Sequence, residues 1–188
     1  MNSVISKLDV RDVAFLGIFI ALILGLGYAL ALVPNVELVT ALIFLSGVLM
    51  GVRKGIFVGI VGEFLFSALN PAGSGLLFLP MLLTQIVAMS LVGATGGIVR
   101  NYVIRWQPNF KNIVIIGLIG LLLTLFYDII VSLAFPVSAG FDIGKIVATV
   151  SAGVVFSVMH LVANTFTFIF LVPLTAKRIW NSVPYFRK

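Results

Sequence analysis

Three observations predict an all-α membrane protein with six transmembrane helices and both termini in the cytoplasm. The 188 residues are 61% hydrophobic and 10% charged, and the mean hydropathy is +1.24. This composition is typical of polytopic membrane proteins and not of soluble domains. The chain also contains six apolar runs, and its basic residues fall almost entirely on one side of the map that these runs define.

The six apolar runs are the predicted spans. Crossing about 30 Å of hydrocarbon takes about 20 helical residues, so the second and third runs are near or below the length of a lipid-facing helix. We expect these two to lean on neighbours or to end in a water-accessible cavity. The chain is interpreted as one integral membrane domain, residues 1–188, with spans at residues 13–33, 36–52, 55–69, 76–99, 113–135 and 146–174.

The distribution of positive charge predicts the orientation. Eleven of the twelve basic residues lie in segments that share one side of the bilayer, and the positive-inside rule makes that side cytoplasmic. The net charge of +6 therefore indicates orientation and not nucleic-acid binding. Lys145 alone lies outside, three residues after Asp142, and we expect these two charges to neutralise each other. The cytoplasmic set is Lys7, Arg11, Arg53, Lys54, Arg100, Arg105, Lys111, Lys177, Arg178, Arg187 and Lys188.

Several classes of chemistry are disfavoured by what the sequence lacks. There is no cysteine, which excludes disulfides, thiolate metal sites and a cysteine nucleophile. No phosphate loop, serine elbow or HExxH metal helix is present, so we expect no catalysis, metal or cofactor here, and ATP-driven work would need partner subunits. The first apolar run is followed by five more, so we expect it to be retained and not cleaved as a signal peptide.

Small residues recur at intervals of four in the first span, at Gly17, Ala21, Gly25 and Ala29. This spacing forms one stripe along a helix, and such stripes let another helix approach closely in lipid. The stripe is either a contact within the bundle or a docking face for another membrane subunit.

Polar residues within the spans predict a ligand cavity in the outer half. Ionisable side chains there cost a few kcal/mol each. Glu63 lies about 9 Å and Asp128 about 10 Å from the outer ends of their spans, and the polar residues follow helical stripes on several spans. The candidate substrate-binding residues are Asn35, Glu37, Glu63, Phe66, Asn70, Gln85, Tyr127, Asp128, His160 and Asn164.

Two other interpretations of these polar residues stay open. Glu63, Asp128 and His160 could pair with one another or with hydroxyl groups simply to hold the bundle together. A proton relay is the other, because desolvation favours neutral carboxylic acids. The excess of carboxylates over basic residues in the cavity favours a neutral or cationic ligand.

The whole chain resembles the substrate-binding S component of an energy-coupling factor transporter, the vitamin-uptake branch of the ABC transporters. The resemblance covers residues 10 to 178. It rests on the size, the six spans with both ends inside, the stripe Gly17, Ala21 and Gly25, the segment Pro34-Asn35-Val36-Glu37-Leu38-Val39-Thr40, and the glycines at 47 to 51 and 55 to 62 around Arg53-Lys54.

The resemblance implies a high-affinity binding subunit in a bacterial or archaeal cytoplasmic membrane. Its ligand would be a vitamin or related micronutrient, held in an outward cavity. The partners would be a transmembrane coupling protein, docked on Gly17, Ala21 and Gly25, and two cytoplasmic ATPases. Family members usually carry alanines in this stripe, and here two of the three positions are glycine, which still allows close approach.

Two rival functions remain. A structural membrane scaffold of the cell envelope, similar to the rod-shape proteins, shares this length and apolarity and needs no cavity. A stand-alone small secondary transporter is disfavoured because the chain has no clear half-to-half repeat.

Overall fold

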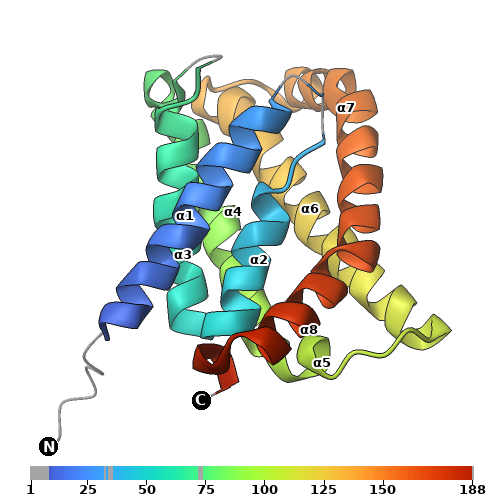
Figure 1. Ribbon diagram of the computed structural model, residues 1–188. Helices are drawn as coiled ribbons and strands as arrows, with labels where there is room; N and C mark the ends of the chain where they lie inside the picture. Colours follow the sequence, from blue (N-terminus) through green and yellow to red (C-terminus); the bar gives the residue numbers. More distant parts are fainter. Residues whose placement is uncertain (1–8, 32, 34–35, 72–73, 188) are drawn as a thin grey trace, which may run out of the picture.

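The computed structural model of the chain describes residues 9–31, 33, 36–71 and 74–187. Within these residues every regular element is a helix and no strand occurs. The longer helices pack side by side into one bundle (Figure 1). In chain order the elements are α1 (Val10–Leu30), α2 (Val39–Met50), α3 (Val52–Ala68), the 3-10 turn η1 (Gly75–Leu77), α4 (Leu79–Ile98), α5 (Arg100–Ile104), α6 (Phe110–Ser138), α7 (Ile143–Phe170), α8 (Val172–Ser182) and the 3-10 turn η2 (Pro184–Arg187).

Four helical segments are long and apolar enough to cross a membrane. They are α1, α4, α6 and the segment Ile143–Ser182 that α7 and α8 form together. The predicted all-α class is therefore confirmed for the described residues, with four helical segments suited to a membrane. By contrast, α2 has 12 residues and α3 has 17, which correspond to about 18 and 26 Å. These two helices belong to the runs that the sequence already marks as short.

The central helix α2 begins at Val39 and not at residue 36 as predicted. The Glu37 carboxylate accepts a hydrogen bond from the Thr40 backbone N–H at 2.9 Å, which satisfies one of the free donors at the start of the helix. Eleven of the 12 residues of α2 are buried. Because neighbouring helices surround it, α2 does not need the length of a lipid-facing helix.

The last two predicted spans differ from the observed helices at their ends. The helix α6 runs to Ser138 and contains Pro136, so the predicted outer loop from residue 136 to 145 shrinks to the few residues between α6 and α7. The sixth run, predicted as one span to residue 174, breaks at Leu171. Pro173 follows in the first turn of α8. Proline has no N–H for the preceding turn and clashes with its carbonyl, so the chain bends there.

Glycines bring α2, α3 and α4 into close contact. A Cβ added to Gly93 would collide with the backbone oxygen of Gly55, and one added to Gly47 with that of Gly93. Gly59 lies equally close to the backbone oxygen of Met89. At the α2–α3 junction Gly51 has φ +89°, a backbone conformation that residues with a side chain rarely adopt. The glycines noted in the sequence around residues 47 to 62 therefore serve helix packing and the sharp turn.

Basic segments gather at one end of the bundle, here called the basic end. It contains the start of α1, the α2–α3 junction, α5, the start of α6, and α8, which runs across the foot of the bundle (Figure 1). Lys7 and Lys188 lie outside the described residues. Lys145 lies at the opposite end, where its Nζ is 3.1 Å from Asp142 Oδ2, so the predicted pairing of these two charges is confirmed.

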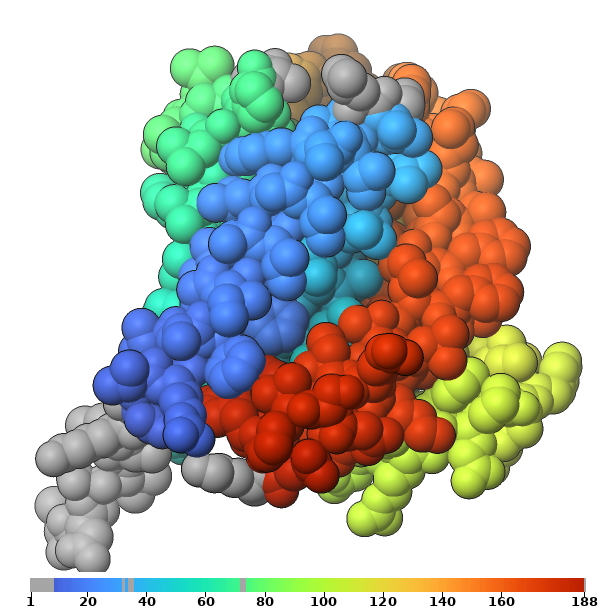
Figure 2. All heavy atoms as spheres, in the orientation of Figure 1, coloured from blue at the N-terminus to red at the C-terminus, as the bar shows by residue number. Residues whose placement is uncertain are grey.

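The C-terminal turn η2 contacts the start of α1 at the basic end. Figure 2 shows α8 and the residues after it covering the bundle beside the start of α1. Lys54 Nζ lies 2.5 Å from Asp12 Oδ1, and the Tyr185 hydroxyl donates to the same carboxylate. Phe15 stacks on Tyr185 with ring centroids 4.5 Å apart. Burial raises the pKa of Tyr185, so the phenol keeps the proton that it donates.

Candidate functional site

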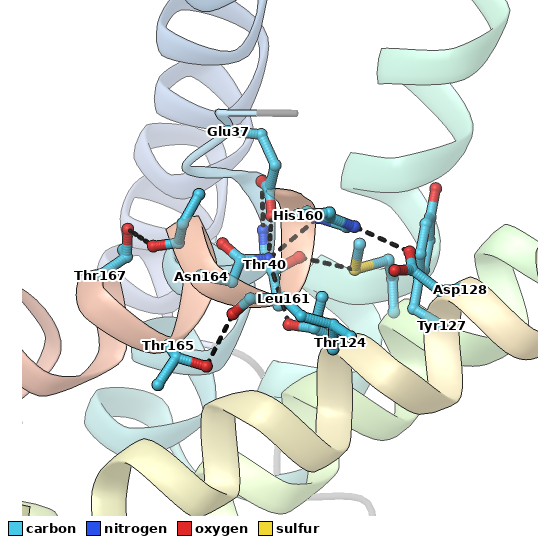
Figure 3. A network of polar contacts seen from close by, with 12 residues as sticks. Glu37, Thr40, Thr124, Tyr127, Asp128, His160, Leu161, Asn164, Thr165 and Thr167 are labelled. Atoms are coloured by element: carbon cyan, nitrogen blue, oxygen red, sulfur yellow. Dashed lines mark hydrogen bonds and ion pairs between the residues drawn. The ribbon is translucent and has the colours of Figure 1, made fainter. Parts of the chain in front are cut away.

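A polar network joins the loop before α2 to α6 and α7 (Figure 3). Glu37 Oε1 accepts a hydrogen bond from Asn164 Nδ2 at 2.8 Å. The same amide nitrogen lies 3.0 Å from His160 Nε2 and 3.2 Å from Thr124 Oγ1. His160 Nδ1 lies 2.7 Å from Asp128 Oδ1. We call these four residues, Glu37, Asp128, His160 and Asn164, the acidic network.

Antiparallel packing of α6 and α7 brings the network together. Gly120 leaves room for the ring of Phe168, and the next contacts along the pair are Thr124 with Asn164 and Asp128 with His160. Each step advances four residues on α6 and recedes four on α7, as the helical repeat requires. The spacing of four on both helices therefore aligns one polar face with the other.

The hydrogen bonds indicate how His160 is oriented. Its Nδ1 faces a carboxylate, so this nitrogen carries a proton. Its Nε2 faces the Asn164 amide nitrogen, a donor, and therefore acts as an acceptor when the ring is neutral. A second proton on Nε2 would point toward Glu37 Oε1, which lies 3.6 Å away. The ring thus lies between two carboxylates.

A second polar cluster joins α3, α4 and α6. Ser67 Oγ lies 3.0 Å from both Glu63 Oε1 and Gln85 Oε1, and Gln85 Nε2 donates to the Tyr127 hydroxyl at 3.3 Å. The Tyr127 ring meets His160 edge-on, with centroids 6.0 Å apart. Tyr127 therefore connects this cluster to the acidic network.

Both groups border one small internal cavity of about 60 Å³. Its lining includes Glu37, Glu63, Phe66, Tyr127 and His160. Ligand pockets for drug-sized molecules usually measure about 300–1,000 Å³, whereas a single water occupies about 30 Å³ of the liquid. The cavity thus has room for water or a very small group. A vitamin-sized molecule requires the lining to move, and Glu37 lies on a loop.

The site is rich in carboxylates. Glu63 is only 2% exposed, and the side chains of Glu37 and Asp128 are 23% and 12% exposed. His160 is the one ionisable group of opposite sign among the described cavity residues. Buried carboxylates without balancing charge are costly unless protons or a bound cation compensate. No group of three potential metal ligands occurs among the described residues.

The structure brings most of the predicted binding residues together. Glu37, Glu63, Phe66, Tyr127 and His160 line the cavity. Gln85, Asp128 and Asn164 touch the lining residues through hydrogen bonds.

Two further residues were predicted to bind the ligand, Asn35 and Asn70. Asn70 follows the end of α3 and is not part of the lining that the described residues form. Asn35 lies outside the described residues.

Four further residues belong to the site. Ser67 lies one turn after Glu63, and Thr40 lies three residues after Glu37, so helical spacing was an available signal for both. Thr124 already lies in the polar stripe of its span. Met89 lines the cavity, and its Sδ lies 3.9 Å from Thr40 Oγ1. Nothing in the sequence around Met89 distinguishes it from other core methionines.

The small-residue stripe of α1 faces away from the bundle. Leu16, Phe19, Ile23 and Gly27 form the buried face of α1, while Gly17, Ala21 and Gly25 are exposed. A Cβ added to Gly17 or Gly25 would meet nothing within 4 Å among the described atoms. A contact within the bundle, one of the two interpretations of the stripe, is therefore excluded for these residues.

Comparison with known proteins identifies no relative: no protein-family model, no curated protein and no solved structure matches the chain.

Proposed function

We propose that this protein is the substrate-binding subunit of an energy-coupling factor importer for a vitamin or related micronutrient. The observation that carries the proposal is the convergence of Glu37, Glu63 and His160 on one small cavity, with Asp128 hydrogen-bonded to His160. Ionisable side chains within membrane spans are costly and usually serve function. Here they come from three helices and one loop, as the site of a bound molecule requires.

The charge of the site favours a neutral or cationic ligand. Two carboxylates, Glu37 and Asp128, flank the His160 imidazole, and Glu63 lines the same cavity as His160. One protonated imidazole would therefore not balance three ionised carboxylates. A ligand with a positive charge or several N–H donors would balance the remaining negative charge. Asn164 Oδ1 and Asp128 Oδ2 are buried without a hydrogen-bond partner among the described residues, and both atoms are acceptors that a donor-rich ligand would satisfy.

Ligand entry would involve the loop before α2. Glu37 bonds this loop to α7 through Asn164, and the same side chain lines the cavity. A ligand that replaces the contacts of Glu37 would release this loop without leaving Asn164 and His160 unpaired.

The proposal includes a topology of six spans with both termini in the cytoplasm. The basic end would face the cytoplasm by the positive-inside rule, where the ATPase partners would lie. The exposed stripe Gly17, Ala21 and Gly25 would dock the transmembrane coupling protein, since it offers close approach on a face that no described part of this chain covers. ATP hydrolysis would belong to the partners.

Equilibrium binding of a panel of radiolabelled vitamins to the purified protein tests the proposal. We expect one neutral or cationic member to bind with submicromolar affinity. Thermal unfolding checks that the purified protein is folded. If it is folded and no vitamin in the panel binds, the vitamin-binding function is rejected. That result would favour the cell-envelope scaffold, which needs no ligand cavity.

A further inference from the structure

A groove of about 230 Å³ lies between α6 and α7, on the other side of the Asp128–His160 pair from the internal cavity. From α6 it is lined by Asp128 and Ser132, and from α7 by Val154, Ser157, Val158 and Leu161, among others. His160 lines the cavity, and its partner Asp128 lines the groove. The 2.7 Å contact between them is therefore the boundary between the two spaces.

The groove opens sideways, toward the lipid-facing surface of the bundle. Val154 and Val158 are 49% and 51% exposed, and Ile129 on α6 is 48% exposed. Most of its surface is apolar side chain, with two hydroxyl groups near the carboxylate. A molecule in this groove would touch lipid along its length, so its body must be apolar.

One polar requirement comes from Asp128, which lines the groove. Asp128 Oδ1 bonds His160, but Asp128 Oδ2 is buried and has no hydrogen-bond partner among the described residues. A buried acceptor left without a donor costs about 1–3 kcal/mol. A carboxylate in this setting is best satisfied by a charged N–H donor.

We propose that the α6–α7 groove is the second half of the ligand site and takes the apolar part of an amphipathic ligand whose ammonium head binds Asp128. The proposal rests on the proposed function and narrows its substrate class to an apolar or aromatic body that carries a protonated amine. It also accounts for the small volume of the internal cavity, which then needs to hold only the head. Separation of His160 from Asp128 would join the two spaces.

Three probes separate the parts of this claim. 4-Phenylbutylammonium carries head and body, methylammonium carries the head alone, and 4-phenylbutanol carries the body alone. Binding is measured by titration calorimetry with the protein in lipid nanodiscs, and empty nanodiscs measured in parallel correct for partition into lipid. We expect 4-phenylbutylammonium to bind at least ten-fold more tightly than either of the other two. Equal binding of the ammonium and the alcohol would overturn the proposed ammonium class.

A tryptophan placed in the groove tests the location. Ser157→Trp fills the groove, and Phe156→Trp is the matched control, since Phe156 is 60% exposed and is not part of the described lining. We expect Ser157→Trp to weaken 4-phenylbutylammonium binding at least ten-fold and Phe156→Trp to leave it unchanged. Equal affinity in both variants, with similar thermal unfolding, would overturn the groove as the binding site.

The head contact and the proposed function are tested separately. Asp128→Asn should weaken 4-phenylbutylammonium binding about ten-fold and leave 4-phenylbutanol binding unchanged; an unchanged ammonium affinity overturns the contact. If labelled vitamins bind and Ser157→Trp changes nothing, the groove fails and the importer function stands. If no vitamin binds while the probe still responds to Ser157→Trp, the groove stands and the importer function fails.

Discussion

Each ionisable residue of the site has a defined partner, and these partners are what the structure adds to the sequence. Glu63 bonds Ser67, Asp128 bonds His160, and Glu37 bonds Asn164. Glu63 and Asp128 were predicted to lie at similar distances from the outer ends of their spans, because helical phase and distance along a helix can be counted from the sequence. Which side chains pair depends on crossing angles and rotamers, which cannot be counted from the helical repeat.

Removing charge at Glu63 or Asp128 should weaken binding of the vitamin that the panel identifies. Hydrogen bonds to charged groups are worth about 1.5–3 kcal/mol, which corresponds to about a ten- to hundred-fold loss of affinity. Glu63→Gln and Asp128→Asn keep the shape of each side chain, so the fold should remain. Equilibrium binding measures the effect.

Ser90→Ala provides the control for this pair, because the Ser90 hydroxyl bonds only the Val87 carbonyl of its own helix in the described contacts. An affinity like that of the unaltered protein in both carboxylate variants would reject the pocket assignment.

The helices show where sequence patterns predict well and where they do not. Long apolar runs located the bodies of all six main helices, but several ends were wrong because local contacts set them. Glu37 delays the start of α2, Pro173 accompanies the break after α7, and Pro136 is tolerated near the end of α6. The short helix α5 was not predicted, since five residues offer too little periodicity.

Docking through α1 predicts a change in transport without a change in binding. Gly17→Leu or Ala21→Leu adds bulk to an exposed face and would prevent close approach of a coupling helix. We expect vitamin uptake by cells that contain the coupling module to be lost while binding to the purified subunit is retained. Ile18→Leu, on a half-exposed neighbouring position, is the control. Uptake at the usual rate in both stripe variants would show that the partner docks elsewhere.

The glycine contacts between α3 and α4 predict a loss of stability. Gly93→Ala places a Cβ against the backbone of Gly55, and backbone atoms cannot move aside as the end of a side chain does. Overpacking of this kind typically costs about 1–3 kcal/mol. Thermal unfolding in detergent should show a lower midpoint for Gly93→Ala, whereas Gly17→Ala, where the space is open, should unfold like the unaltered protein. Matching midpoints for the two variants would contradict the packing described above.

At the scale of the whole molecule, the distribution of charge along the sequence and the fold both distinguish a basic end of the bundle from an opposite end. The described basic segments other than Lys145 gather at the basic end, and the importer function that we propose would have this end face the cytoplasm. The sequence predicted this division because loop charge sets orientation and needs no tertiary detail. It did not predict that the unliganded cavity would be small, since cavity volume depends on how side chains close around it.

The orientation predicts which end is reached from outside the cell. The chain has no cysteine, so a single cysteine introduced by mutation is the only site in this protein that a maleimide can label. Lys145→Cys, 69% exposed as a side chain, should react with a membrane-impermeant maleimide on intact cells. Arg53→Cys, at the exposed α2–α3 junction, should react only after lysis. Labelling of Arg53→Cys on intact cells would reverse the orientation.

The central claim is that the buried carboxylate cluster binds a small molecule. Mass spectrometry of molecules released from the purified protein tests it most directly, with Glu63→Gln purified in parallel. We expect one neutral or cationic small molecule in near-stoichiometric amount from the unaltered protein, and much less from Glu63→Gln. The same molecule in equal amount from both, or none from either after supply of the vitamin panel, would contradict the claim.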